Sequence, residues 1–146
     1  MFWFDRENPD VVFADNRELH TNLCDGRSLD IRPDVFMDFT DMPFPDNTFW
    51  HVVFDPPHLK DIGESSWMAQ KYGKLPKNWK KLIYDGFHEC MRVLRPNGTL
   101  IFKWNEQQIP VREILKAIGD EYKPMYGHKS GVRQMTHWMA FMKNGE

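Results

Sequence analysis

The hydrophobic residues of this chain occur in short runs that are separated by polar and turn-forming residues. Residues 11–14, 34–38 and 48–54 have the length and composition of buried strands. Residues 19–31 alternate between apolar and polar positions on both sides of an Asp25-Gly26 turn, which predicts a hairpin. The first part of the chain is therefore expected to consist of strands and turns.

The longest helix is predicted between Asn78, a suitable N-cap residue, and residues 95–98, where proline and glycine end it. Its apolar positions recur at three- and four-residue steps, and they are Trp79, Leu82, Ile83, Phe87, Cys90, Met91 and Leu94. A second helix is expected over residues 110–119, because a proline is tolerated in the first turn of a helix.

Further strands are expected in the second half of the chain. Residues 99–102 have the pattern of a buried strand, and edge strands are expected around residues 124–126 and 137–141. Strands that alternate with helices favour an α/β domain with a mainly parallel sheet and an antiparallel last strand.

The composition is that of a single globular domain spanning residues 1–146, with 41% hydrophobic and 14% aromatic residues. No apolar run reaches the length of a membrane span, and no signal peptide is recognised, so a cytoplasmic location is expected. Cys24 and Cys90 belong to no CxxC pair, so both are expected to be reduced, with Cys90 in the core. The histidines show no metal-ligand spacing, and no metal site is predicted.

Charge is distributed unevenly along the chain, although the net charge is only −2. Residues 1–60 hold 5 Lys and Arg against 12 Asp and Glu, a net −7, whereas residues 61–146 hold 14 against 9, a net +5. A polyanion would therefore meet the second half of the chain. The alternative is an ordinary solvated surface with uneven charge.

The tetrad Asp55-Pro56-Pro57-His58 directly follows the predicted strand 48–54, at the end where open α/β sheets bind ligands. Two prolines lack N–H donors, so carbonyl oxygens outnumber donors in this turn. Asp55 and the carbonyl of Pro56 could accept both hydrogens of a planar amino group, while His58 lies against the ring that carries it. The alternative is that Asp55 caps the strand end and His58 is an ordinary half-exposed histidine.

The long connection over residues 59–77 combines aromatic residues with lysines, among them Trp67, Tyr72 and Lys74. Such a segment is typical of a lid that contacts nucleic-acid phosphates and bases. The alternative is a solvated approach to the following helix, with Trp67 packed beneath it. The predicted strand 99–102 is followed directly by Lys103, Trp104 and Asn105, and these three residues could line the same cleft.

The order of these features resembles the S-adenosylmethionine-dependent methyltransferases that methylate amino groups of DNA and RNA. Their tetrad is Asp, Asn or Ser, then two prolines, then an aromatic residue, which residues 55–58 match except at the last position. Residues 38–49 look like the family's acid-ended strand and approach to the tetrad, and residues 92–100 like its helix-to-strand passage. Residues 54–59 and 100–106 also resemble small phage and prophage methyltransferase-like proteins.

This resemblance implies a minimal Rossmann-like methyltransferase fold that binds S-adenosylmethionine. It assigns the tetrad to catalysis, and Asp15, Asp38 and Phe54 to the cofactor. The family normally opens with a glycine-rich turn, but the first glycine here is Gly26. Either residues 11–15 replace the family's first strand, with residues 15–17 in place of the glycine loop, or the sheet is truncated.

The function expected from the resemblance is methyl transfer to an exocyclic amino group of a nucleic-acid base, adenine N6 before cytosine N4. DNA or RNA is the expected partner, and no membrane is expected. One alternative is a non-catalytic binding module, or a subunit that lacks a complete cofactor site and works as a homo-oligomer or with a partner subunit. Another is a methyltransferase for small molecules.

Overall fold

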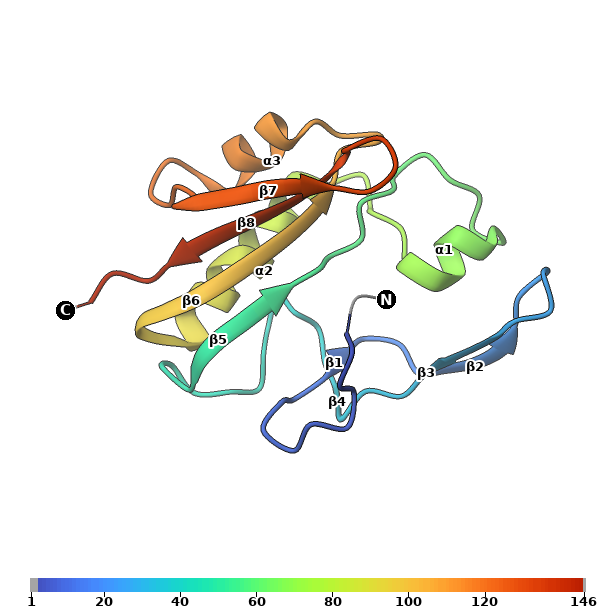
Figure 1. The fold of residues 1–146 in the computed structure, drawn as a ribbon, viewed down its shortest axis with the longest axis horizontal. Helices are drawn as coiled ribbons and strands as arrows, with labels where there is room; N and C mark the ends of the chain where they lie inside the picture. The colour runs from blue at the N-terminus through green and yellow to red at the C-terminus, as the bar shows by residue number, and fades with distance from the viewer. Residues whose placement is uncertain (1–2, 146) are drawn as a thin grey trace. The chain divides into compact units, whose positions relative to one another are not determined.

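The computed structural model describes residues 3–145, and the chain divides into two compact units, Met1–Phe39 and Thr40–Glu146. They are called here the N-terminal unit and the C-terminal unit, and their elements are labelled in Figure 1. No helix among residues 3–145 is long and apolar enough to cross a membrane. Within the same residues, no three His, Cys, Asp or Glu side chains cluster in a way that could hold a metal ion. The expectation of one domain stays a prediction.

The N-terminal unit contains two small strand pairs. Strands β2 (Leu19–Asn22) and β3 (Ser28–Ile31) form the predicted antiparallel hairpin, and Gly26 in its turn has φ of 83°. Strands β1 (Ala14–Asp15) and β4 (Val35–Phe36) pair in parallel.

The expectation of two core strands in this unit was wrong in extent and in burial. Each strand is only two residues long, and the side chain of Phe36 is 66% exposed. The small core of the unit instead comes from the hairpin side, where Leu23, Leu29 and Ile31 are buried against Leu19. A short apolar run indicates a strand, but long-range packing decides whether that strand is covered.

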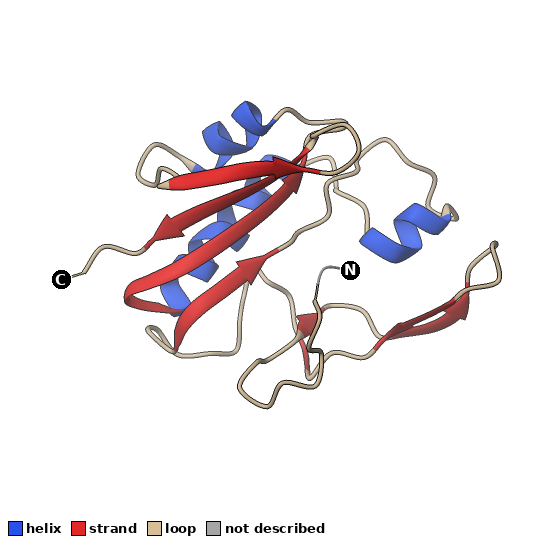
Figure 2. Ribbon diagram, in the orientation of Figure 1, coloured by secondary structure: helices blue, strands red, loops and turns tan. Residues whose placement is uncertain are grey.

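The C-terminal unit is built on a four-stranded sheet with the order β5-β6-β8-β7 (Figure 2). It comprises β5 (Phe49–Phe54), β6 (Leu94–Asn105), β7 (Tyr126–Ser130) and β8 (Thr136–Met142). Only β5 and β6 are parallel, whereas β8 pairs antiparallel with both β6 and β7. The predicted antiparallel last strand is confirmed, because β8 runs opposite to the other three strands. The prediction of a mainly parallel sheet was wrong for the strand pairings, since two of the three are antiparallel. β8 is also an inner strand rather than an edge strand.

Two helices cover one face of this sheet, as Figure 1 shows. They are α2 (Trp79–Val93) and α3 (Val111–Ile118), and both confirm the predicted helices. Phe87 of α2 is fully buried and meets Phe102 at 6.0 Å and Phe141 at 5.0 Å between ring centroids. Burying a side chain of this size contributes about 1.5–3 kcal/mol. The predicted side-chain cap by Asn78 is wrong, since its side chain makes no capping bond.

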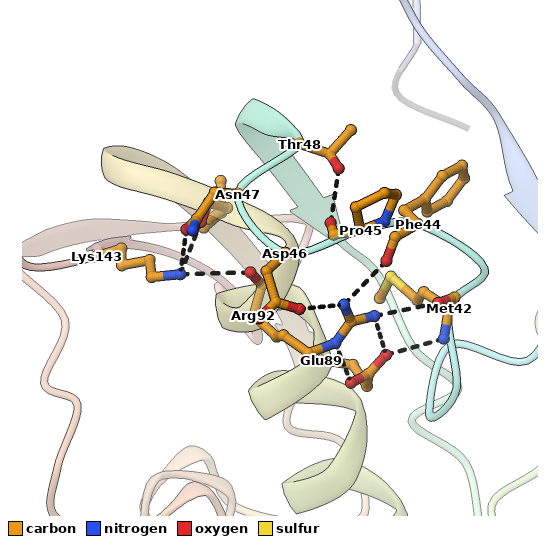
Figure 3. Close-up of polar contacts among 10 residues, drawn as sticks. Met42, Phe44, Pro45, Asp46, Asn47, Thr48, Glu89, Arg92 and Lys143 are labelled. Carbon is orange, nitrogen blue, oxygen red and sulfur yellow. Dashed lines mark hydrogen bonds and ion pairs between the residues drawn. The ribbon is translucent and has the colours of Figure 1, made fainter.

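A polar network fixes the loop that leads into β5 (Figure 3). The Arg92 guanidinium donates to the carbonyls of Met42 at 3.1 Å and Phe44 at 2.9 Å, and it pairs with Glu89 and Asp46, each at 2.7 Å. Glu89 also accepts the Met42 N–H at 2.9 Å. These bonds lower the pKa of Glu89, with the hydrogen bond from Arg92 as the largest cause. The loop before β5 is thus held by the body of α2.

Lys143 closes the same region from the end of the chain. Its Nζ donates to the Asn47 side chain at 2.9 Å and to the carbonyls of Arg92 at 3.3 Å and Leu94 at 2.8 Å (Figure 3). The backbone N–H of Thr48 donates to the carbonyl of Val93 at 2.8 Å. β5 therefore starts from a fixed point, and this fixes where its carboxyl end projects.

Candidate functional site

The tetrad Asp55-Pro56-Pro57-His58 lies at the carboxyl end of β5, as expected from the sequence. Pro56 is buried, whereas Asp55 is exposed and His58 is half-buried. The parallel register sets Phe54 opposite Phe102 of β6, so the residues that follow these two are neighbours. The segment that follows β5 thus presents one exposed carboxylate next to a buried proline.

Lys103 pairs with the carboxylate of the tetrad. Its Nζ donates to Asp55 Oδ2 at 2.9 Å, and the two side chains are 24% and 37% exposed. Lys103 also lies over the ring of Trp138, with its Nζ 5.6 Å from the ring centroid. The sequence placed Asp55 and Lys103 in one cleft, and the structure brings them into direct contact.

Trp138 is a member of this cluster that the sequence did not single out. It stands opposite Lys103 in the antiparallel register of β6 and β8. Its Nε1 donates to Ser130 Oγ at 2.7 Å, and its ring is nearly parallel to that of His128, with 6.4 Å between centroids. No local pattern could have revealed Trp138, because its place depends on a pairing between distant strands.

Two predicted aromatic residues gather around His58. The ring of Tyr72 lies 5.9 Å away at 50°, and the ring of Trp104 lies 6.3 Å away at 81°. Burial lowers the pKa of His58 below its ordinary value, Asp55 opposes this shift, and Lys103 adds to it. The imidazole is accordingly neutral at neutral pH and can offer a flat, uncharged face.

Other predicted site residues occupy supporting positions. Trp104 is 1% exposed, and its Nε1 donates to the Ile109 carbonyl at 2.9 Å. Phe54 is 4% exposed and packs on Phe102 at 5.1 Å. Both side chains are therefore core residues that support the site from below, which is not the surface contact expected of them.

The remaining predicted contact residues differ in how they are held. Asn105 donates to Thr136 Oγ1 at 3.2 Å and accepts the Gln107 N–H at 3.0 Å, so it shapes the turn after β6. Trp67 begins the short helix α1 (Trp67–Tyr72) and is exposed, as are Tyr72 and Lys74. Of the group, these three could reach a ligand in the solvent.

Gln108, which the sequence did not flag, holds the segment that follows the tetrad. Its Oε1 accepts the N–H groups of Lys60 at 2.7 Å and Asp61 at 2.9 Å, and its Nε2 donates to the Asp61 carbonyl at 3.2 Å. The Leu75 N–H donates to the Leu59 carbonyl at 2.8 Å, and both leucines are buried. These bonds fold residues 59–77 into a loop with a fixed base.

An open pocket of about 830 Å³ lies along this loop. It is lined by Lys60, Asp61, Glu64, Lys74, Leu75, Pro76, Lys77 and Trp79. Its first lining residue comes two positions after His58. A volume of this size is ordinary for a ligand site.

The two acids predicted to bind a cofactor, Asp15 and Asp38, both belong to the N-terminal unit. The carboxylate of Asp15 accepts three bonds from Arg17: from Nε at 2.9 Å, from Nη2 at 2.9 Å and from the backbone N–H at 3.0 Å. Asp15 thus closes its own turn. With Asp15 engaged and the Phe54 side chain buried, two of the three predicted residues do not fit a cofactor as side-chain ligands.

No protein-family model matches this chain, and no curated protein matches it in sequence. TTHA0409 of Thermus thermophilus, a candidate DNA modification methylase, matches with a TM-score of 0.50 and 11% identity, over 75% of this chain and 52% of that chain. Its complex with S-adenosyl-L-methionine gives a TM-score of 0.47 at 13% identity, over 71% of this chain and 51% of that chain. The PH0226 protein of Pyrococcus horikoshii gives a TM-score of 0.49 at 14% identity, over 74% of this chain and 57% of that chain.

The match to TTHA0409 concerns the fold of the chain. The mixed α/β architecture of the chain is similar to that of TTHA0409. The chain spans little more than half of the length of the structures that it matches.

Proposed function

We propose that this chain is an S-adenosylmethionine-dependent methyltransferase with a minimal Rossmann-like fold. Its acceptor would be an exocyclic amino group of a nucleic-acid base, adenine N6 before cytosine N4. The observation that carries this proposal is the exposed Asp55 carboxylate on a two-proline turn at the carboxyl end of β5. The fold shared with a candidate DNA modification methylase supports it.

The turn supplies acceptors for an amine. In a planar exocyclic amine the nitrogen lone pair is delocalised into the ring, so the nitrogen is a poor nucleophile. Asp55 and the Pro56 carbonyl would accept its two hydrogens and favour a tetrahedral nitrogen with an available lone pair. These hydrogen bonds strengthen as the nitrogen becomes positively charged, so they stabilise the transition state more than the ground state.

Lys103 orients the carboxylate for this task. Its bond to Oδ2 at 2.9 Å restrains the Asp55 side chain, and its ammonium group also lies 5.6 Å from the centroid of the Trp138 ring. A carboxylate fixed in this way needs little reorganisation when the amine binds. Lys103 is in this account a positioning residue.

His58 would stack on the acceptor base. A neutral ring backed by Tyr72 and Trp104 offers such a surface. Stacking of a base on an aromatic side chain is worth about 1–3 kcal/mol. An acceptor base in a duplex would first leave the helical stack.

When bound, S-adenosylmethionine would supply a methyl group from a positively charged sulfur, which would leave as a neutral thioether, and the methylated amine would lose one proton to solvent. The expected cofactor residues fit it only in part, since Asp15 is engaged by Arg17 and Phe54 is buried. We therefore assign no step to the donor side. The same observation favours a second candidate function, a methyltransferase-fold subunit or binding module without a complete cofactor site.

The proposal is tested by incubating the protein with methyl-labelled S-adenosylmethionine and unmethylated DNA or RNA, then separating the nucleosides. Label in N6-methyladenine is expected, and label only in N4-methylcytosine would reassign the base. Titration calorimetry with the cofactor separates the two candidate functions. No binding at millimolar cofactor would refute the stand-alone enzyme and support the subunit.

A further inference from the structure

We infer that the pocket along residues 60–79 binds a nucleotide that neighbours the acceptor base in single-stranded nucleic acid. This inference rests on the proposed function, because it assigns the acceptor to a polynucleotide chain. The pocket and the tetrad belong to one continuous segment, and only Leu59 lies between His58 and Lys60. In this proposal, a strand whose base reaches the tetrad passes along the pocket that the following residues line.

The charges of the pocket suit a phosphate. Lys60, Lys74 and Lys77 line it together with Asp61 and Glu64. Lys60 faces Asp61 at 3.7 Å, so part of its charge is offset locally. Lys74 and Lys77 remain as the cations that can approach an anion from the solvent, and both are exposed.

The other lining residues suit a base. Trp79 is half-buried and presents aromatic surface at the pocket, next to the buried Leu75 and to Pro76. Stacking on an aromatic residue beside lysines is the usual way in which proteins bind single strands without reading sequence. The volume of about 830 Å³ is ample for one nucleotide.

The wall of the pocket is held in place rather than loose. Gln108 fixes the backbone of Lys60 and Asp61 through three hydrogen bonds, and the bond between Leu75 and Leu59 closes the opposite side. A prearranged wall loses less entropy when a ligand binds. Single strands are favoured over duplexes because a paired, stacked base cannot enter a pocket.

The test is fluorescence anisotropy with a labelled 12-nucleotide single-stranded DNA that contains adenine, its RNA counterpart and the corresponding duplex. The double variant Lys74→Gln/Lys77→Gln should bind both single strands about tenfold more weakly, and the slope of log K against log salt should fall by about 1.4 in magnitude. The matched control Arg112→Gln/Lys116→Gln removes two exposed charges from α3 and should change binding less than about twofold. The duplex should bind the wild type more weakly than either single strand.

The inference would be overturned if the lysine variant bound as tightly as the wild type, or if the control variant lost as much affinity. It would also be overturned if the duplex bound more tightly than the single strands, or if no probe bound. Methyl transfer measured in parallel separates the two claims. Lysine-dependent binding without transfer would refute only the proposed function, whereas transfer that is indifferent to both lysines would refute only the pocket.

Discussion

The segments before and after β5 are held in very different ways. Residues 42–48 are tied to α2 and to Lys143 by a network centred on Arg92, which binds two carbonyls and two carboxylates. Residues 59–77 are tied near both ends, by Gln108 at residues 60 and 61 and by the bond between Leu75 and Leu59, whereas α1 between these ties has no buried residue. The direction of β5 is therefore set by a rigid approach, whereas α1 can move between the fixed ends of the segment that follows the tetrad.

The largest effect is expected from disrupting the Arg92 network that holds residues 42–48. Arg92→Ala removes bonds to two backbone carbonyls and the cation that pairs with Glu89 and Asp46, so the free energy of unfolding should fall by about 2 kcal/mol. Urea denaturation measures this loss. The control Arg112→Ala removes a long side chain from the surface and should change stability by less than about 0.5 kcal/mol. Equal losses in the two variants would mean that the network does not hold the approach.

The next effect concerns the tetrad, which lies between the two segments along the chain. Lys103→Met keeps the length of the side chain but removes the bond to Asp55, so the rate of methyl transfer should fall about tenfold, or about 1.4 kcal/mol in the barrier. Lys103→Arg should retain most of the rate, because it can still donate to the carboxylate. An unchanged rate in Lys103→Met would mean that Lys103 does not position Asp55 for methyl transfer.

A smaller effect is expected from removing the Gln108 bonds that hold the start of residues 59–77. Gln108→Ala removes three hydrogen bonds to residues 60 and 61, so trypsin should cleave within residues 59–77 about fivefold faster. The neighbouring variant Gln107→Ala is the matched control, since the Gln107 bond within the turn comes from its backbone N–H. If both variants are cleaved at the same rate as the wild type, Gln108 does not restrain the segment.

The smallest effect is a pH dependence at His58. Burial lowers its pKa in the folded state, so the native state takes up a proton less readily than the unfolded chain. Stability from this residue is fully present above its ordinary pKa of 6.5 and is lost as the pH falls toward the lower folded value. Urea midpoints at pH 7.5 and 5.0 should therefore drop further in the wild type than in His58→Phe. Identical drops would mean that His58 is not desolvated.

Elements with local signals were predictable from the sequence. The periodic apolar residues gave helix α2, the proline and glycine at either end gave α3, and the Asp25-Gly26 turn gave the hairpin. Strand β5 was predictable because an apolar run leads directly into the proline pair. In each case, side chains close in sequence decide the structure.

Features set by distant pairing were not predictable. β8 lies inside the sheet because β6 pairs with it over seven residues, and this register also brings Trp138 to Lys103. Gln108 reaches its partners across 47 and 48 residues of sequence. The pairing of Asp15 with Arg17 is local, but an acid two residues from an arginine is too common a pattern to have indicated it.

The labelled methyl-transfer assay on Asp55→Ala tests whether Asp55 accepts a hydrogen of the acceptor amine. Transfer to DNA or RNA should fall at least about 100-fold, with cofactor affinity by calorimetry nearly unchanged, because the lost bond matters chiefly in the transition state. Asp55→Asn keeps an oxygen acceptor and should retain more activity than Asp55→Ala. Wild-type transfer by Asp55→Ala would contradict the assignment of the acceptor site to the tetrad.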